Sequence, residues 1–492
     1  MNDDKNSNWL DERARQTMAQ NGFEPNFPAD ALKQLGQIEQ AGDLPKINAA
    51  VQDLRELLWS SIDNQSSRDL DQIEYAEQLD NGDIRILVGI ADVDHLVGKD
   101  TALDRHAAQN TVTIYTETEM FPMLPEELST GLTSLNENED REAIVVELVI
   151  KQDGDVPGNN VFPAVVRNRA KLAYETVGTW LDDDEAVPDK VASTPGLKEQ
   201  ILLQKTASER LHKFRLEKGA LEFESIESSA VVENGEVRSI VSVTENSARK
   251  LIENFMVAAN VEMAEFLERK GSPSLRRVVK TPLHWDGIRE ISEKLGTALP
   301  EQPDARALGE FLIEQRQKDP IHFPDLSLSI IKLIGSGEYV VQRPGEDGEG
   351  HFGLGVRDYA HSTAPNRRYS DIVVQRLVKS ALAGQPPPYS ADDLEAIAQH
   401  CNEQERAERK VERKMRKIVA ATVMKRHVGE NFDAIVTGVT DHGTFARILR
   451  PPVDGRIIQG EHGLRLGQKV NVRLLAANPA NGFIDFAANN NN

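Results

Sequence analysis

Three aspartates lie close together near the start of the chain, at Asp63, Asp69 and Asp71. Carboxylates gathered this closely repel one another, so a fold that brings them together must neutralise them, and a hard divalent cation does so directly. Magnesium takes one or two carboxylates from a protein and keeps the other positions for water and substrate phosphate oxygens. A solvated acidic turn is the alternative, because Asp and Ser are ordinary turn residues.

The amino-acid composition limits the classes of protein to which this chain can belong. The 492 residues are enough for several domains, and 39% hydrophobic with 28% charged residues is ordinary for a soluble globular chain. The single cysteine, Cys401, excludes an internal disulfide and a cysteine-rich zinc site. The N-terminus lacks the basic start and apolar stretch of a signal peptide, and no apolar run reaches membrane-spanning length. These features predict a cytoplasmic protein with no membrane contact.

The formal net charge of −22 argues against casual binding to nucleic acid. Phosphate backbones favour Lys and Arg, so any contact with RNA must be locally basic. One such stretch lies between Glu405 and Arg426, where basic residues crowd a helix-like segment. The alternative is a solvated helix with ion pairs such as Glu405 with Arg409 and Glu412 with Arg416.

The N-terminal region has the pattern of short helices separated by prolines. We predict helices over Trp9–Gln20, Asp30–Gln40 and Lys46–Trp59. In the third, apolar residues recur at helical spacing from Ile47 to Leu58, which indicates one buried face. A helical cap on the next domain and a helix-turn-helix unit that contacts nucleic acid are the two interpretations.

From Asp69 onward the pattern changes to strands and then to helices. Branched residues bounded by turn residues predict strands over Ile84–Ile90, Thr111–Tyr115, Ala143–Ile150 and Val161–Asn168. Helices are predicted over Leu172–Leu181, Lys198–Glu217, Ser247–Lys270, Trp285–Leu295, Ala305–Asp319, the segment after Asn366, and Ala391–Arg426. This proportion indicates an α+β fold with helices packed on a central mixed sheet. Alternation over Phe432–Ile448, Gly463–Leu475 and Gly482–Phe486 predicts a small five-stranded OB barrel.

Further motifs follow the aspartates in order, at Ile90–His95, Pro122–Ser129 and Tyr359–Asp371. In that order and spacing they resemble the catalytic domain of the ribonuclease II family, processive exoribonucleases that include ribonuclease R. The likeness runs from about residue 60 to 382, and a second one, to OB-type RNA-binding modules of ribosomal proteins, covers residues 431 to 487. The resemblance implies an RNB catalytic domain at 60–428, preceded by a helical domain at 1–59 and followed by an OB barrel at 429–488 and a disordered tail at 489–492.

The resemblance also implies a metal site that holds Mg²⁺ or Mn²⁺. The three aspartates occupy three of the family's four aspartate positions, and the fourth falls on Gln72. These four residues are the implied metal ligands. A glutamine oxygen can bind magnesium but carries no full charge. The substitution leaves open whether the site is fully active, binds metal weakly, or recruits Glu74 or Asp92 as a replacement.

Catalytic and RNA-binding roles follow from the same resemblance. Asp71 and Arg367 are implied to be catalytic, and a guanidinium fork suits the charge that develops on the scissile phosphate. Arg368 is placed at the substrate, with an ion pair to Asp371 as the alternative. Further substrate contacts are implied for Tyr115, Tyr174, Phe223, Glu253 and, in the barrel, Phe445 beside Phe432 and His442.

These residue types suit a nuclease that reads no sequence. Aromatic rings stack on any base, and a contact of Glu253 with the 2′-hydroxyl would distinguish RNA from DNA. For each aromatic residue taken alone, core packing is the alternative. The predicted protein is a monomeric exoribonuclease that degrades single-stranded RNA from its 3′ end to 5′-mononucleotides, without an organic cofactor. The alternatives are a non-enzymatic RNA-binding protein of the same fold, disabled by Gln72, and a single-strand DNase.

Overall fold

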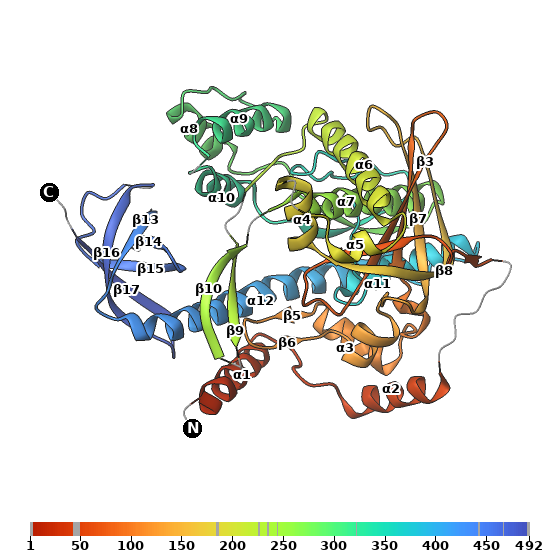
Figure 1. Cartoon of the computed structure of the whole chain (residues 1–492), viewed down its shortest axis with the longest axis horizontal. Helices are drawn as coiled ribbons and strands as arrows, with labels where there is room; N and C mark the ends of the chain where they lie inside the picture. Colours follow the sequence, from red (N-terminus) through yellow and green to blue (C-terminus); the bar gives the residue numbers. More distant parts are fainter. Residues whose placement is uncertain are drawn as a thin grey trace.

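The computed structural model describes residues 3–42, 50–183, 186–224, 227–233, 236–243, 245–320, 322–440, 443–465 and 467–489. A body of sheet and helices forms most of the molecule, and a small barrel lies at the C-terminal end of the long helix α12 (Figure 1). This confirms the predicted α+β class with its central mixed sheet and five-stranded barrel.

The helices and strands have the following bounds. The α-helices are α1 (Asp3–Gln20), α2 (Ala29–Ala41), α3 (Ala102–Asn110), α4 (Tyr174–Asp183), α5 (Asp189–Ser193), α6 (Leu197–Glu217), α7 (Ser247–Arg269), α8 (Trp285–Lys294), α9 (Ala305–Lys318), α10 (Phe323–Ile334), α11 (Tyr369–Leu382) and α12 (Ala391–Met424). The strands of the body are β1 (Gln52–Asp53), β2 (Trp59–Asp63), β3 (Gln72–Gln78), β4 (Ile84–Ala91), β5 (Ile114–Tyr115), β6 (Met120–Phe121), β7 (Asp140–Ile150), β8 (Gly158–Ala173), β9 (Glu227–Glu233), β10 (Glu236–Val243), β11 (Ser274–Val278) and β12 (Glu338–Gln342). The barrel strands are β13 (Asn431–Thr440), β14 (Gly443–Leu449), β15 (Pro452–Gln459), β16 (Lys469–Asn478) and β17 (Phe483–Asn489).

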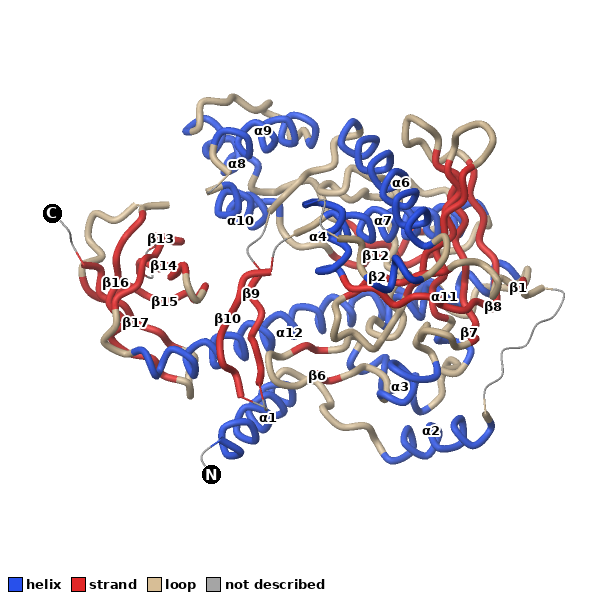
Figure 2. Tube along the Cα trace, in the orientation of Figure 1, coloured by secondary structure: helices blue, strands red, loops and turns tan. Residues whose placement is uncertain are grey.

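The central sheet has the strand order β1-β8-β2-β3-β4-β7, and its two ends meet because β8 also pairs with β7. The first half of β8 runs antiparallel to β7, and its second half runs parallel to β2. Strand β4 is buried along almost its whole length, as expected for a strand covered on both faces. Helices α6 and α7 pack on each other, and α6 also contacts β3 (Figure 2). The acidic motif connects β2 to β3 at one end of this sheet.

The two N-terminal helices pack on separate parts of the chain. In α1, Leu10, Ala14 and Met18 join an apolar cluster with residues of α12. In α2, Leu35 belongs to the main core, and the N–H of Leu103 donates to a side-chain oxygen of this helix at 2.9 Å. These two helices were predicted, and each begins earlier in the structure than in the prediction.

The third predicted helix, Lys46–Trp59, is wrong over its described part. Strand β1 occupies residues 52–53, and Trp59 begins β2. The N–H of Leu54 donates to the carbonyl of Val165 in β8 at 2.9 Å. Pairing with β8 satisfies the backbone here, and the leucines that suggested a helical face are partly buried against the main core. Residues 43–49 of this prediction lie outside the described residues.

Other predicted segments differ in their bounds. The helix predicted from Leu172 begins at Tyr174, because β8 continues to Ala173. The strand predicted over Thr111–Tyr115 is limited to β5, because Thr111 ends α3 with a left-handed backbone at φ 61°. The predicted disordered tail is wrong at Asn489, which ends β17 and donates to the side chain of Asn471 at 2.7 Å. Residues 490–492 lie outside the described residues.

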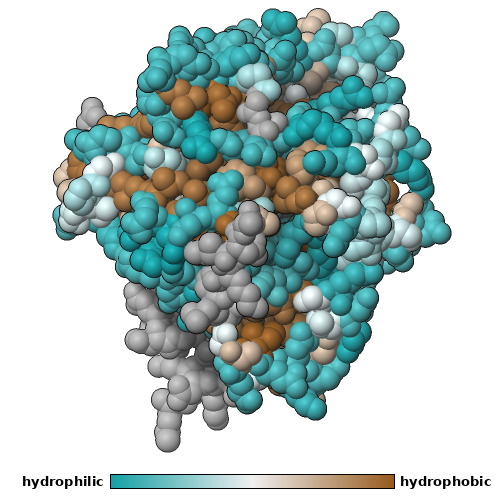
Figure 3. Space-filling view, turned by 90° about the vertical axis from the view of Figure 1, so that its right-hand side faces the viewer, coloured by the Kyte–Doolittle hydropathy of each residue, from teal (hydrophilic) through white to brown (hydrophobic). Residues whose placement is uncertain are grey.

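The barrel closes in the order β13-β14-β15-β17-β16 around an apolar core that α12 helps to fill with Ala421 and Met424. Most of the face in Figure 3 is hydrophilic, with apolar residues gathered in smaller patches, in keeping with the net charge of −22. Within the described ranges, no helix combines the length and the apolar character needed to cross a bilayer.

Candidate active site

The turn after β2 holds the first carboxylate of the acidic motif. The Asp63 carboxylate accepts hydrogen bonds from the Asn64 N–H at 2.7 Å and from the Ser67 hydroxyl at 2.9 Å. Such local bonds fix a short polar side chain in a turn. Burial raises the pKa of Asp63, and the two hydrogen bonds lower it. The turn is exposed at Asn64, and Asp63 itself is half-buried.

The other two aspartates are separated by a buried leucine. The N–H of Leu70 donates to the hydroxyl of Ser134 at 2.9 Å, which anchors the segment in the core. Asp69 accepts a hydrogen bond from the Tyr115 hydroxyl at 3.1 Å. The side chain of Tyr115 remains 43% exposed. Its hydroxyl is therefore fixed at the acidic motif while part of the residue stays accessible, as a stacking residue requires.

Asp71 is the most constrained carboxylate of the motif. It is 2% exposed, and it accepts hydrogen bonds from the Asn366 N–H at 2.9 Å and from the Arg367 Nε at 3.2 Å. Burial raises the pKa of Asp71 to about 7, against the opposing effect of the Arg367 charge. The two residues predicted to be catalytic thus form an ion pair, although they are far apart in sequence.

The neighbouring arginine has a different environment. The guanidinium of Arg368 forms two hydrogen bonds to the Asp371 carboxylate, at 2.7 and 2.9 Å. Asp371 is fully buried at the start of α11 and also accepts from the Ala364 N–H. The ion pair that was the alternative for Arg368 is therefore present. Arg368 still lines a cavity of about 230 Å³ together with Tyr115, Arg367 and two carboxylates of α12, Glu405 and Glu408.

Tyr174 begins α4 beside the turn after β2. The guanidinium of Arg249 lies over its ring, 4.5 Å from the centroid, and also donates to Asn64 at 3.0 Å. Sequence reasoning did not single out Arg249. Its position four residues before Glu253 puts both on one face of α7, and that spacing was the available signal.

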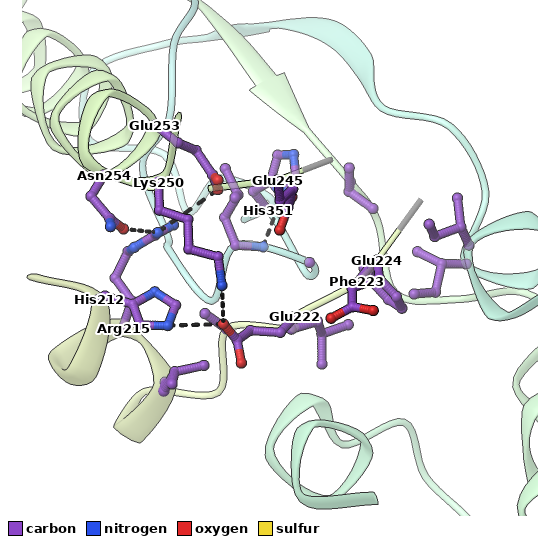
Figure 4. A pocket seen from close by; sticks show the side chains of 18 of the residues that line it. His212, Arg215, Glu222, Phe223, Glu224, Glu245, Lys250, Glu253, Asn254 and His351 are labelled. Carbon is purple, nitrogen blue, oxygen red and sulfur yellow. Dashed lines mark hydrogen bonds and ion pairs between the residues drawn. The ribbon is translucent and has the colours of Figure 1, made fainter. Parts of the chain in front are cut away.

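Phe223 and Glu253 lie at a second cavity, of about 330 Å³. Phe223 packs partly against the apolar cluster of α8, α9 and α10, and Glu253 is more than half exposed near Arg215. Figure 4 shows His212 and Lys250 converging on Glu222 in this cavity. The structure thus places Tyr115 and Arg368 at one cavity and Phe223 and Glu253 at another.

The basic helix and the barrel carry the remaining predicted residues. Phe445 is 36% exposed on β14, whereas Phe432 packs partly against the barrel core. The predicted stacking residue His442 lies outside the described residues.

Arg409 pairs with Glu405 at 2.8 Å as the solvated-helix alternative predicted, but Arg416 pairs with Glu117 instead of Glu412. A cavity of about 250 Å³ between α12 and the barrel is lined by the basic residues Arg413, Arg416 and Lys417.

Two models of known families match this chain. The RNB domain matches residues 51–384, more than half of the chain, and the RNase II-type exonuclease C-terminal S1 domain matches residues 430–489. The chain belongs to the RNB-domain family. It is 32% identical to ribonuclease R of Vibrio cholerae over 94% of this chain, but it spans only 59% of that relative's length.

Solved structures show the same RNB fold. The RNase R of Mycoplasma genitalium, in complex with ribose methylated single-stranded RNA, aligns with a TM-score of 0.86 at 22% identity, covering 97% of this chain and 78% of the other. Yeast Ssd1, described as a pseudonuclease, aligns with a TM-score of 0.66 at 15% identity, covering 88% of this chain and 52% of the other. At these identities the likeness shows the fold alone.

The RNB-domain family implies a divalent metal, and the residues present fit one held by few protein ligands. Within the described ranges, no three His, Cys, Asp or Glu side chains form a group that could hold an ion. The side chains of the acidic motif offer carboxylate and amide oxygens, which suit Mg²⁺ or Mn²⁺ when water and phosphate fill the remaining positions.

One further carboxylate fits this donor set. Glu74 on β3 is 0% exposed, and neither of its carboxylate oxygens has a hydrogen-bond partner among the described residues. Burial raises the pKa of Glu74 well above its usual range, and the negative charge of Asp63 raises it further. Asp92, the other proposed replacement, is engaged by the ammonium of Lys379 at 2.8 Å. The Nδ1 of His95 lies 3.2 Å from a carboxylate oxygen of Glu142.

Proposed function

We propose that this protein is a divalent-metal-dependent exoribonuclease that removes nucleotides from the 3′ end of single-stranded RNA and releases 5′-mononucleotides. The observation that carries the proposal is the ion pair between the buried Asp71 and Arg367, formed where the acidic motif meets the Asn366–Arg368 segment, in a chain of the RNB-domain family. We further propose a catalytic unit at 60–428 after an N-terminal region at 1–59, a barrel at 429–488, and a cytoplasmic monomer that uses no organic cofactor.

The residues of the acidic motif would hold a divalent ion beside the scissile phosphate, and Arg367 would orient that phosphate. A bound divalent ion supplies charge neutralisation at the phosphate and a more acidic water molecule. Arg367 uses its Nε for Asp71 in the described structure, and its side chain is 47% exposed. Its terminal nitrogens can therefore reach phosphate oxygens and remain charged at any working pH. Asp71 fixes the direction of this guanidinium.

The aromatic residues would hold the 3′-terminal nucleotides without reading their bases. Tyr115 has its hydroxyl held by Asp69, so the position of its ring is set before substrate arrives. Glu253 and Phe223 line the second cavity, where a carboxylate can accept a hydrogen bond from a ribose 2′-hydroxyl. Arg413, Arg416 and Lys417 provide a locally basic surface between the catalytic body and the barrel for the incoming strand.

The experiment is degradation of RNA labelled at either end, across a titration of Mg²⁺. Hydrolysis from the 3′ end releases a labelled mononucleotide from 3′-labelled RNA at the first step, and from 5′-labelled RNA only at the end. Asp71→Asn is the inactive variant, and Asp347→Asn, at a fully exposed aspartate paired with Arg357, is the matched control. If neither the wild type nor the control degrades RNA at any metal concentration, the proposal is wrong.

A second candidate is an RNA-binding protein without nuclease activity. Gln72 favours it, because an amide binds metal ions more weakly than a carboxylate. The fold also occurs in a protein described as a pseudonuclease. This candidate predicts that RNA binds and no mononucleotide appears. A single-strand DNase, the third candidate, predicts equal degradation of an all-deoxy oligomer.

A further inference from the structure

Strand β3 has a carboxylate at Glu74, two residues after Gln72, where the family resemblance leads us to expect an aspartate. Gln72 and Glu74 are next-but-one neighbours on this strand, so their side chains point to the same face of the sheet. The metal site that the family resemblance implies has a neutral amide at Gln72 and a carboxylate one step further along that face. A glutamate side chain is also one methylene longer than an aspartate, which extends its reach back along the strand.

The environment of Glu74 supplies no hydrogen-bond partner from the part of the chain that the structure describes. Ser60 on β2 is directly opposite Glu74 in the sheet register. The hydroxyl of Ser60 and both carboxylate oxygens of Glu74 are buried and lack hydrogen-bond partners among the described residues. A buried carboxylate without a partner is strongly unfavourable unless a cation or a proton neutralises it. The hydroxyl oxygen of Ser60 and the two carboxylate oxygens of Glu74 therefore lie on neighbouring strands without hydrogen bonds from the described residues.

These oxygens lie at the acidic motif. The negative charge of Asp63 acts directly on Glu74. The charges of both carboxylates also act on the hydroxyl of Tyr174, which stands over the turn after β2. Asp63 ends β2, and Glu74 is two residues from the start of the adjacent antiparallel strand β3, so both lie toward the same end of this strand pair.

We propose that Glu74 supplies the carboxylate that Gln72 lacks, so that Asp63 and Glu74 together hold the divalent ion and Gln72 contributes a neutral oxygen. Two carboxylates are the number that magnesium usually takes from a protein. The inference rests on the proposed metal-dependent function.

The test is a titration of full-length protein with Mn²⁺ alone, in which electron paramagnetic resonance measures the free ion. The variants are Glu74→Gln, which removes the charge and keeps the shape, and the double variant Gln72→Asp with Glu74→Gln, which moves the charge back. Glu262→Gln is the matched control, because Glu262 is also a buried carboxylate with an unpartnered oxygen but pairs with Arg269 on α7. Circular dichroism and melting temperature verify that each variant folds.

We expect Glu74→Gln to weaken Mn²⁺ binding by at least about tenfold, the lower end of what metal sites lose on smaller changes. The double variant should regain affinity to within about threefold of the wild type on the same scale, and Glu262→Gln should bind as the wild type does. Unchanged binding by Glu74→Gln overturns the inference. Failure of the double variant to recover also overturns it, because Glu74 would then support the strand without binding the ion.

A second measurement applies if Glu74→Gln does not fold. Anomalous scattering from a Mn²⁺-soaked crystal of the wild type should place the ion in direct contact with an oxygen of Glu74, and an ion bound elsewhere contradicts the inference. Failure of the proposed function gives a different result: the wild type then binds no Mn²⁺ and releases no mononucleotides. If the wild type degrades RNA while Glu74→Gln binds Mn²⁺ unchanged, only the role of Glu74 is wrong.

Discussion

The cavity at Tyr115 and Arg367 and the cavity at Phe223 and Glu253 hold their charges in different ways. Beside the first, two adjacent arginines each pair with one buried carboxylate, Arg367 with Asp71 and Arg368 with Asp371.

In the second cavity, the carboxylate of Glu222 is shared among His212 at 2.9 Å, Lys250 at 3.6 Å and Arg316 at 3.6 Å. One-to-one buried pairs fix geometry and penalise its loss, whereas shared pairs can exchange partners at little cost. The first arrangement suits chemistry at a fixed phosphate, and the second suits a strand that moves through after each cut.

The largest effect should follow Asp71→Asn in the first cavity. The amide keeps the shape and can still accept from the Asn366 N–H, but it removes the charge that orients Arg367 and helps to attract the metal ion. We expect the rate of mononucleotide release to fall by more than about 100-fold, as when one preorganised electrostatic group is lost. Circular dichroism and the melting temperature verify that the variant folds, because loss of one partner of the ion pair also lowers stability. Glu222→Gln in the second cavity is the comparison, and an equal loss of activity there would remove the distinction between the two cavities.

Substitution of the two adjacent arginines should have different effects, on activity for Arg367 and on stability for Arg368. Arg367→Lys keeps a charge but loses the fork, so we expect kcat/KM to fall by about 100-fold at nearly constant stability. Arg368→Lys breaks the two-bond pair with the fully buried Asp371, so we expect a loss of about 1–3 kcal/mol in the free energy of unfolding. Urea unfolding and steady-state kinetics on both variants measure this. Equal stability losses would mean that both arginines are structural.

Aromatic truncation should have smaller effects, and on binding more than on chemistry. Tyr115→Ala and Phe223→Ala should each weaken binding of a single-stranded oligonucleotide by about 1–3 kcal/mol, the range for one stacked base. Tyr115→Phe is the matched control, because it keeps the ring and loses only the hydrogen bond to Asp69. Fluorescence anisotropy in the absence of metal measures these affinities. Wild-type affinity in Phe223→Ala would assign that ring to the apolar cluster of α8–α10 alone.

The sequence could predict the parts of the molecule that local patterns determine. Long helices with apolar periodicity, such as α7 and α12, were found with small errors at their ends. The five-stranded barrel was predicted, but β15 lies outside the segments that were named for it. The helix predicted over Lys46–Trp59 was wrong over its described part. Pairing with β8, more than a hundred residues away, overrides the local helical pattern there. Long-range pairing of this kind leaves no mark in a short window of sequence.

The predictions about the site have the same limit, because they lack the contacts between distant parts of the chain. Resemblance selected Asp71 and Arg367, but only the fold shows that they pair across almost 300 residues. It also placed Tyr115 and Phe223 in one functional class, and the structure separates them into two cavities. Glu74 was noticed as a nearby charge in sequence, whereas its lack of a partner is a property of packing that no pattern contains.

The smallest effects should appear in the pH dependence of stability, with opposite signs in the two cavities. Burial, with the charges of Glu412 and Glu405, raises the pKa of Glu408 in the first cavity to about 8. The hydrogen bond from His212 is the main reason that the pKa of Glu222 in the second cavity falls to about 2.

Between about pH 4.5, the pKa of an unfolded glutamate, and pH 8, folded Glu408 binds a proton that the unfolded chain does not, so its contribution to stability falls as pH rises. Folded Glu222 binds fewer protons than the unfolded chain between pH 4.5 and 2, so its contribution is present above pH 4.5 and falls as pH decreases. The slope for one proton is at most about 1.4 kcal/mol per pH unit, and solvent contact reduces it for both side chains.

Urea unfolding of Glu408→Gln and Glu222→Gln from pH 3 to pH 8.5 measures how each glutamate contributes to the free energy of unfolding. We expect Glu408→Gln to gain stability over the wild type as pH rises above 5, with the largest gain near pH 8. We expect Glu222→Gln to be less stable than the wild type at pH 7 and to approach it as the pH falls below 4. Parallel pH curves for Glu408→Gln and the wild type would mean that Glu408 is solvated, and the first cavity would then owe its fixed geometry to its two arginine pairs and not to exclusion of water.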